Sequence, residues 1–273
     1  MKESPLSTDF LIQFNLYKRS GLNIHPQDFK RIAKFYNIDE FYCKTLIKKH
    51  EEVVNNLVAS IKKEHNVLID NIGSTYNKSI IFIGDSLTSD RESYLNMLRC
   101  MFQDYSNIRF IDSAISGDTT FDILKRLYDS VLNIDFDAAF ILIGTNDAKI
   151  ALEGTEHNLI SLEEYKRNLK FIIKNIKNKG AKIFILTLPY VNAEKYRGYF
   201  KNKMDYSTEK IDQYNHVIKD VAQELNIGLV DIHQKLSGLK TKDYLLEDGI
   251  HLNNLGQTII CQSVLQALHK KDT

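Results

Sequence analysis

The chain has few cysteines, prolines and glycines and almost no net charge, and each shortage excludes a class of protein. Its three cysteines, Cys43, Cys100 and Cys261, lie far apart and form no C-x-x-C pair. This spacing argues against a disulfide framework or a zinc site and favours reduced thiols in a cytoplasm. Only 3 prolines and 12 glycines exclude collagen-like and proline-rich linker architectures. With 36 Lys+Arg against 35 Asp+Glu, the chain has no general attraction to nucleic acids or anionic lipids.

Long apolar runs are also missing. The strongest runs have the length of a strand, far below the roughly 18 residues that span a bilayer. The apolar stretch near the N-terminus is interrupted by Gln13 and Asn15, unlike the core of a secretion signal. We therefore expect a cytoplasmic protein without membrane insertion. A hydrophobic content of 43% is nevertheless typical of a globular protein and excludes wholesale disorder.

Two regions of the chain differ in apolar patterning. From residue 9 to about 71 the apolar spacing is helical, and Asp39 is placed to cap the second of two helices. The polar, glycine-containing segment from Asp70 to Ser79 predicts a domain boundary. We therefore predict a helical N-terminal region over residues 1–76 and a second domain over residues 77–273.

The N-terminal region has two interpretations. The stretch from Ile32 to Ile47 has the apolar spacing of a helix-turn-helix. Residues 1–76 hold 11 Lys/Arg and 9 Asp/Glu, however, so the region lacks the basic excess typical of DNA binding. We favour a helical hairpin that packs on the second domain, acts as a lid or joins two copies of the chain, and we expect no nucleic acid partner.

After Ser79, apolar runs of strand length alternate with amphipathic helices. Continuous apolar strands separated by helices indicate a parallel sheet that is covered on both faces. Five strands with right-handed crossovers predict a flavodoxin-like, doubly wound α/β/α sandwich. In such sheets ligands bind beyond the carboxyl ends of the strands. The predicted strands are 80–83, 108–111, 138–143, 182–188 and 227–232, and helices are predicted near 90–103, 119–132, 161–179, 207–225 and 254–269.

Three candidate site residues, a serine, a glycine and an asparagine, follow the first three predicted strands. Ser86, after the first, is placed to be an exposed nucleophile at a helix N-terminus, or to cap that helix. Gly117, after the second, lets a backbone N–H approach a substrate oxygen, or belongs to an ordinary loop. Asn146, after the third, offers a side-chain amide to an oxyanion, or forms a turn.

A carboxylate and a histidine stand together before the last predicted helix. Asp248 precedes His251 by three residues. At that spacing a carboxylate can hold one imidazole nitrogen, fix the tautomer and stabilise the imidazolium. The other seven histidines lack such a setting, and we interpret them as surface or core residues.

Together, and in this order, these motifs resemble those of the SGNH hydrolases, also called the GDSL family of esterases and lipases. The resemblance implies that Ser86 is the nucleophile and that Asp248 and His251 complete a catalytic triad. It also implies an oxyanion hole formed by the backbone N–H groups of Ser86 and Gly117 and the side chain of Asn146. The implied reaction is hydrolysis of a small or medium ester through an acyl-enzyme, without a cofactor or metal.

The resemblance covers about residues 79–269 and has one departure. Many members carry an asparagine near the end of the second strand, where this chain has Asp112 or Ser113. The chain lacks a G-x-S-x-G elbow, a P-loop and a G-x-G-x-x-G turn, which disfavours other hydrolase and nucleotide-binding classes. Two alternatives stay open: an acyltransferase with the same triad, and a non-catalytic binding or regulatory protein on this fold.

An aromatic segment follows the fourth predicted strand. Residues 189–206 carry five aromatic side chains. Tyr190, Tyr196, Tyr199 and Phe200 are predicted to line a substrate pocket, because the segment leaves a strand at the edge where ligands bind. The alternative is a structural loop that covers helix ends.

Overall fold

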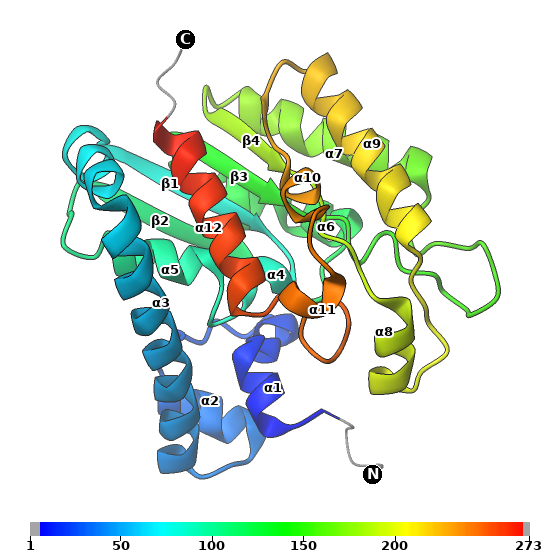
Figure 1. Cartoon of the computed structure of the whole chain (residues 1–273), viewed down its shortest axis with the longest axis horizontal. Coiled ribbons are helices and arrows are strands. Elements are labelled where there is room, and N and C mark those ends of the chain that lie inside the picture. The colour runs from blue at the N-terminus through cyan, green and yellow to red at the C-terminus, as the bar shows by residue number, and fades with distance from the viewer. Residues whose placement is uncertain (1–5, 270–273) are drawn as a thin grey trace.

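The computed structural model describes residues 6–269, so the outermost residues of both predicted domains, 1–5 and 270–273, lie outside it. Its centre is a five-stranded parallel sheet in the order β2-β1-β3-β4-β5 (Figure 1). The strands are β1 (Lys78–Gly84), β2 (Ile108–Ala114), β3 (Ala138–Leu142), β4 (Lys182–Leu186) and β5 (Gly228–Val230). This strand order confirms the predicted flavodoxin-like sandwich.

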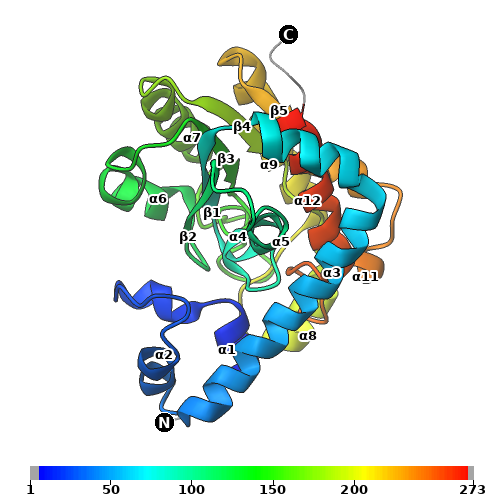
Figure 2. The same ribbon diagram turned by 90° about the vertical axis from the view of Figure 1, so that its left-hand side faces the viewer.

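Helices cover both faces of the sheet, which explains why the central strands are apolar without alternation. Ile80 to Ile83 of β1 are completely buried, as is all of β3. Figure 2 shows α6 and α7 on one side of the sheet and α5 and α12 on the other. The covering helices are α5 (Tyr94–Met101), α6 (Thr120–Leu127), α7 (Leu162–Lys177), α9 (Thr208–Glu224) and α12 (Asn254–His269).

Several connections contain further short helices. The predicted helix over 119–132 is α6 followed by a π-helical turn, η2, and the aromatic segment after β4 contains α8. The edge strand β5 is shorter than predicted, as is common for an exposed sheet edge. The short elements are α4 (Ser86–Ser89), η2 (Tyr128–Leu132), α8 (Ala193–Phe200), α10 (Ile232–Leu236) and α11 (Thr241–Tyr244).

The N-terminal region forms a small helical layer with its own core. Its elements are α1 (Thr8–Gln13), the 3-10 turn η1 (Leu16–Ser20), α2 (Phe29–Tyr36) and α3 (Glu40–Thr75). Asp39 caps α3 as predicted, accepting a hydrogen bond from the backbone N–H of Tyr42. Ile12, Tyr17 and Ile32 pack in this small core with Cys43 and Ile47 from the start of α3.

The long helix α3 connects this layer to the sheet domain. Its first half contacts α1 and α2, while Val54, Val58 and Ile61 belong to the main core and its second half packs on α5 and α12. The helix departs from helical geometry at His65. It continues to Thr75, so the segment Asp70–Ser79, where we predicted a boundary, consists mostly of the last turns of α3 and the start of β1 rather than a free linker.

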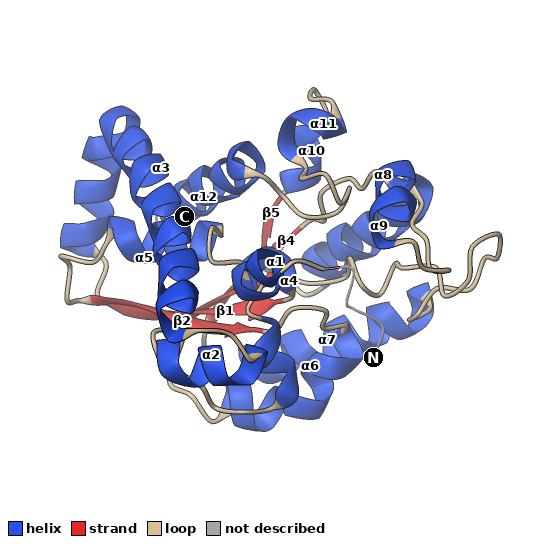
Figure 3. Cartoon of the chain, turned by 90° about the horizontal axis from the view of Figure 1, so that it is seen from below, coloured by secondary structure: helices blue, strands red, loops and turns tan. Residues whose placement is uncertain are grey.

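The strand order determines where a site can form. The chain crosses from β1 to β2 on one side and then returns to place β3 on the other side of β1. The carboxyl ends of β1 and β3 therefore flank the point where ligands bind in doubly wound sheets. Seen from below, in Figure 3, α1 lies across this edge next to α4. Among residues 6–269, no helix has both the length and the apolar character needed to cross a bilayer.

Candidate active site

Ser86, His251 and Asp248 form a continuous chain of hydrogen bonds at this edge. The Oγ atom of Ser86 is 2.9 Å from Nε2 of His251, and Nδ1 of His251 is 2.5 Å from Oδ2 of Asp248. Ser86 is the first residue of α4, directly after β1, and Asp85 caps that helix. The structure therefore brings Ser86 to His251, which stands 165 residues later in the sequence, and to the nearby Asp248.

The Asp248 carboxylate is held in the ionised form that this arrangement requires. Burial alone would raise its pKa, but the charge of His251 and the hydrogen bonds it accepts outweigh burial and lower the pKa. Its Oδ1 atom accepts from the backbone N–H groups of Ile250 and His251, both at 3.0 Å. These bonds fix the carboxylate against Nδ1 of the imidazole, and Nε2 faces the Ser86 hydroxyl.

Asn146 joins the segments that carry Ser86 and Gly117. Its amide nitrogen donates to the backbone carbonyl of Asp118 at 3.0 Å and makes a longer contact of 3.4 Å to the carboxylate of Asp85. Gly117 has a φ of +85°, a conformation that side chains disfavour. Within residues 6–269 the backbone N–H groups of Ser86 and Gly117 have no hydrogen-bond acceptor.

Two buried carboxylates, those of Asp85 and Asp147, lie at this edge of the sheet. Asp147 accepts hydrogen bonds from the backbone and hydroxyl of Thr120 at the start of α6. Burial raises the pKa of Asp147 to about 7, against the effect of these bonds. Burial likewise raises the pKa of Asp85 to about 7, and the nearby carboxylates of Asp147 and Asp118 add to the shift. Neither carboxylate was predicted as part of the site, because each stands directly beside a residue that was, Ser86 or Asn146.

The N-terminal region contributes a wall to the site, which the sequence did not predict. The ring of Phe14 stacks on the imidazole of His251 with a centroid distance of 4.0 Å, and Phe10 lies edge-on to it at 5.7 Å. Phe14 is 1% exposed. The hydroxyl of Ser116, next to Gly117, donates to the backbone carbonyl of Phe14. This wall thus contacts both sides of the site.

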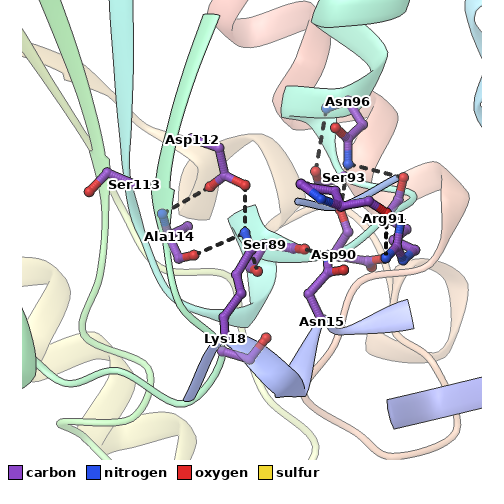
Figure 4. Close-up of polar contacts among 12 residues, drawn as sticks. Asn15, Lys18, Ser89, Asp90, Arg91, Ser93, Asn96, Asp112, Ser113 and Ala114 are labelled. Atoms are coloured by element: carbon purple, nitrogen blue, oxygen red, sulfur yellow. Dashed lines mark hydrogen bonds and ion pairs between the residues drawn. The ribbon is translucent and has the colours of Figure 1, made fainter. Parts of the chain in front are cut away.

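Polar contacts fasten the N-terminal region to the segment after Ser86, as Figure 4 shows. The side chain of Asn15 donates to the backbone carbonyl of Ser89 at 2.6 Å, and Arg91 donates to the carbonyl of Ile12 at 3.1 Å. Lys18 forms an ion pair of 2.6 Å with Asp112. Asp112, one of the two residues at which the sequence departs from the family pattern, thus gives the N-terminal region a charged partner on β2.

The four predicted aromatic residues separate into two groups. Tyr199 and Phe200 lie 6.2 and 6.3 Å from the ring of Phe10, which itself contacts His251. Tyr196 is buried beneath Phe200 at 4.8 Å. Tyr190 instead packs on His233, at 4.0 Å, away from these rings. In the part of the chain that the structure describes, no group of three or more His, Cys, Asp or Glu side chains is arranged to hold a metal ion.

The chain is similar to known proteins in both sequence and fold. The model of the GDSL-like lipase/acylhydrolase family matches residues 82–259. The chain is 24% identical to an acetylxylan esterase of Geobacillus stearothermophilus, over 72% of this chain and 95% of the esterase. It is 24% identical to lipoprotein YqeF of Bacillus subtilis, over 63% and 78%. A lipase/acylhydrolase from Enterococcus faecalis superposes with a TM-score of 0.58 at 23% identity, covering 70% of this chain and 95% of that structure.

Proposed function

Because the chain belongs to the GDSL-like lipase/acylhydrolase family, we propose that it is a serine ester hydrolase that works through Ser86, His251 and Asp248. The observation that carries the proposal is the unbroken hydrogen-bond chain from the Ser86 hydroxyl through His251 to Asp248. A serine hydroxyl is a weak nucleophile unless an adjacent base removes its proton. In this proposal His251 is the base, and Asp248 is the carboxylate that orients it.

In the first step His251 accepts the proton of Ser86 at Nε2 while the serine oxygen attacks the ester carbonyl. The negative charge that develops on the carbonyl oxygen is stabilised by the N–H groups of Ser86 and Gly117 and by the Asn146 amide. The long contact of Asn146 to Asp85 is weak, so that N–H can turn toward the oxyanion. His251 then protonates the leaving alcohol.

In the second step water replaces the alcohol. His251 accepts a proton from the water as it attacks the acyl-enzyme, and the same three donors stabilise the second oxyanion. As the tetrahedral intermediate collapses, the bond to the Ser86 oxygen breaks, the carboxylic acid is released and His251 returns its proton to Ser86. An acyltransferase would use the same groups and admit an alcohol in place of this water, so the acceptor alone separates the two activities.

A small or medium acyl group fits the aromatic wall of the site. Phe10 contacts His251, and Tyr199 and Phe200 of α8 contact Phe10, so these three rings support an apolar wall beside the site. Aromatic walls of this kind bind short acyl chains or rings. The acetylxylan esterase among the relatives makes an acetyl group the first to test.

We also retain three proposals about the chain as a whole. The separate core around Ile12 and Ile32 supports treating residues 1–76 and 77–273 as two units. The stacking of Phe14 on His251 supports a lid-like role for the N-terminal region, with a contact between two copies of the chain as its alternative. The free thiols of the three cysteines support a cytoplasmic location.

The test is hydrolysis of p-nitrophenyl esters from acetate to octanoate by the wild type and Ser86→Ala, with folding checked by circular dichroism. We expect the substitution to lower kcat by about 10⁶-fold, because the nucleophile is removed. Ser237→Ala, on an exposed surface serine, is the matched control and should behave as the wild type. Equal turnover by wild type and Ser86→Ala would refute the proposal, and product analysis with added alcohol separates hydrolysis from acyl transfer.

A further inference from the structure

Arg19, from the N-terminal region, lies directly over the proposed oxyanion hole. Its Nη1 atom is 3.1 Å from the position that a Cβ atom on Gly117 would occupy. Glycine at this position therefore makes room for the guanidinium as well as for a substrate. Among residues 6–269, no ion pair or side-chain hydrogen bond involves Arg19. An exposed guanidinium is thus held beside the reacting groups without a carboxylate partner.

Lys149 lies beside Asn146 on the sheet-domain side of the proposed oxyanion hole, where its backbone N–H donates to the carbonyl of Asn146 at 3.3 Å. It follows Asn146 by three residues, and its ammonium lies 5.7 Å from the ring centroid of Tyr196 and 5.4 Å from that of Tyr206. Burial lowers its pKa to about 8, and repulsion from Arg19 contributes, while Asp85 acts in the opposite direction. The ammonium has no ion-pair partner among the residues that the structure describes.

This pair differs from the other cations around the site. Lys18, Arg126 and Arg197 each pair with an aspartate at 2.6 to 2.8 Å. A half-buried ammonium and a guanidinium that both lack an ion-pair partner are stabilised when a ligand brings an anionic group to them. Uncompensated charge of this kind concentrates at functional sites, because a ligand of opposite sign supplies the missing partner.

We propose that Arg19 and Lys149 together recognise an anionic group, a carboxylate or a phosphate, on the ester substrate. The inference rests on the proposed function, since it names the substrate class of the same site. The guanidinium offers two parallel N–H donors to an oxyanion, and the ammonium adds a point charge. Because Arg19 covers Gly117, the anionic group lies close to the ester that Ser86 attacks.

The kinetic test uses acetyl esters that share one aromatic ring. 4-Acetoxybenzoate and 4-acetoxyphenyl phosphate carry the anion, and 4-acetoxybenzamide is the neutral counterpart. We expect Arg19→Gln and Lys149→Met each to lower the anionic-to-neutral ratio of kcat/KM by about tenfold, the size expected for losing one charged hydrogen bond. Intrinsic differences between the esters cancel when each variant is compared with the wild type. The anion with the larger ratio identifies carboxylate or phosphate as the preferred group.

Matched controls remove charges elsewhere. Arg31→Gln removes an exposed arginine on α2, and Lys203→Met removes an exposed lysine after α8; both should keep the wild-type ratio. Raising the salt concentration should lower the wild-type ratio, since screening weakens charge recognition. If Arg19→Gln and Lys149→Met lower turnover of neutral and anionic esters equally, the pair does not select charge and the proposal is wrong.

A binding measurement separates this proposal from the proposed function. The amides 4-acetamidobenzoate, 4-acetamidophenyl phosphate and 4-acetamidobenzamide have the same shapes as the esters but are far harder to hydrolyse, so titration calorimetry on the wild type measures recognition alone. Tighter binding of an anionic amide, weakened about tenfold by Lys149→Met, supports the inference even if no ester is hydrolysed. Equal binding of all three amides overturns it, while hydrolysis of the neutral ester would leave the proposed function standing.

Discussion

The sheet domain and the N-terminal region contribute different things to one site. The sheet domain carries Ser86, Asp248 and His251, together with every proposed oxyanion donor. The N-terminal region carries none of these groups, yet Phe14 covers the imidazole and Arg19 covers Gly117. We infer that the sheet domain provides the reaction and that the N-terminal region sets which substrates reach it. This division of roles can be tested by changing one residue at a time on either side.

The largest effect on the sheet side, after loss of the nucleophile, should come from Asp248→Asn. The amide keeps the shape of the side chain but favours the wrong imidazole tautomer, so we expect kcat to fall by about 10⁴-fold. Steady-state kinetics on p-nitrophenyl acetate measure it. Asp243→Asn on α11 is the matched control, because that carboxylate accepts from the backbone N–H of Lys240 rather than from His251. A fall of less than tenfold would mean that Asp248 does not orient the base.

Asn146→Ala should have the next largest effect. Removing one of three oxyanion donors lowers kcat by about 10²- to 10³-fold. KM should change much less, because the donor acts on charge that develops in the transition state. Asn158→Ala is a control in the same connection, since its amide donates instead to the backbone carbonyl of Ala148. Full activity of Asn146→Ala would mean that Asn146 is not an oxyanion donor.

The sheet domain was predictable because its signals are local. The run Ile80–Ile83 is apolar at every position, which is typical of a strand covered on both faces, and the structure buries it completely. The polar motifs follow these runs directly, so parallel strands bring Ser86 and Asn146 to the same edge. The roles of these residues in catalysis remain predictions, although the geometry brings together the groups that the sequence singled out.

The contribution of the N-terminal region was not predictable in the same way. Phe10 and Phe14 have the spacing of an ordinary helical apolar face, and nothing local shows that His251, more than 200 residues later, completes their packing. The ion pair of Lys18 with Asp112 is equally distant in sequence. The unusual Asp112 was the available signal, since a charged residue on a strand requires a partner.

Phe14→Leu tests whether the N-terminal wall affects the reaction. Leucine keeps an apolar contact but loses the stacked ring that holds the imidazole, so we expect kcat to fall by about tenfold. Phe41→Leu on α3 is the matched control, because that ring is 78% exposed. Thermal denaturation of both variants separates lost positioning from lost folding. Unchanged kcat in a folded Phe14→Leu protein would confine this wall to a structural role.

The smallest expected effect is a pH dependence of anion recognition by Lys149 and Arg19, one from each region. Lys149 has a pKa lowered to about 8, so it loses its charge as the pH rises through that value. Tyr196 and Tyr206, whose rings contact Lys149, have raised pKa values and stay neutral there. Asp85, with a pKa of about 7, is already ionised above that value.

The anionic-to-neutral ratio of kcat/KM should therefore fall by about fivefold between pH 7 and pH 9. Taking the ratio cancels every pH effect on the reaction that both esters share. Lys149→Met should show a constant ratio over this range, and a constant ratio in the wild type as well would mean that Lys149 does not face the substrate.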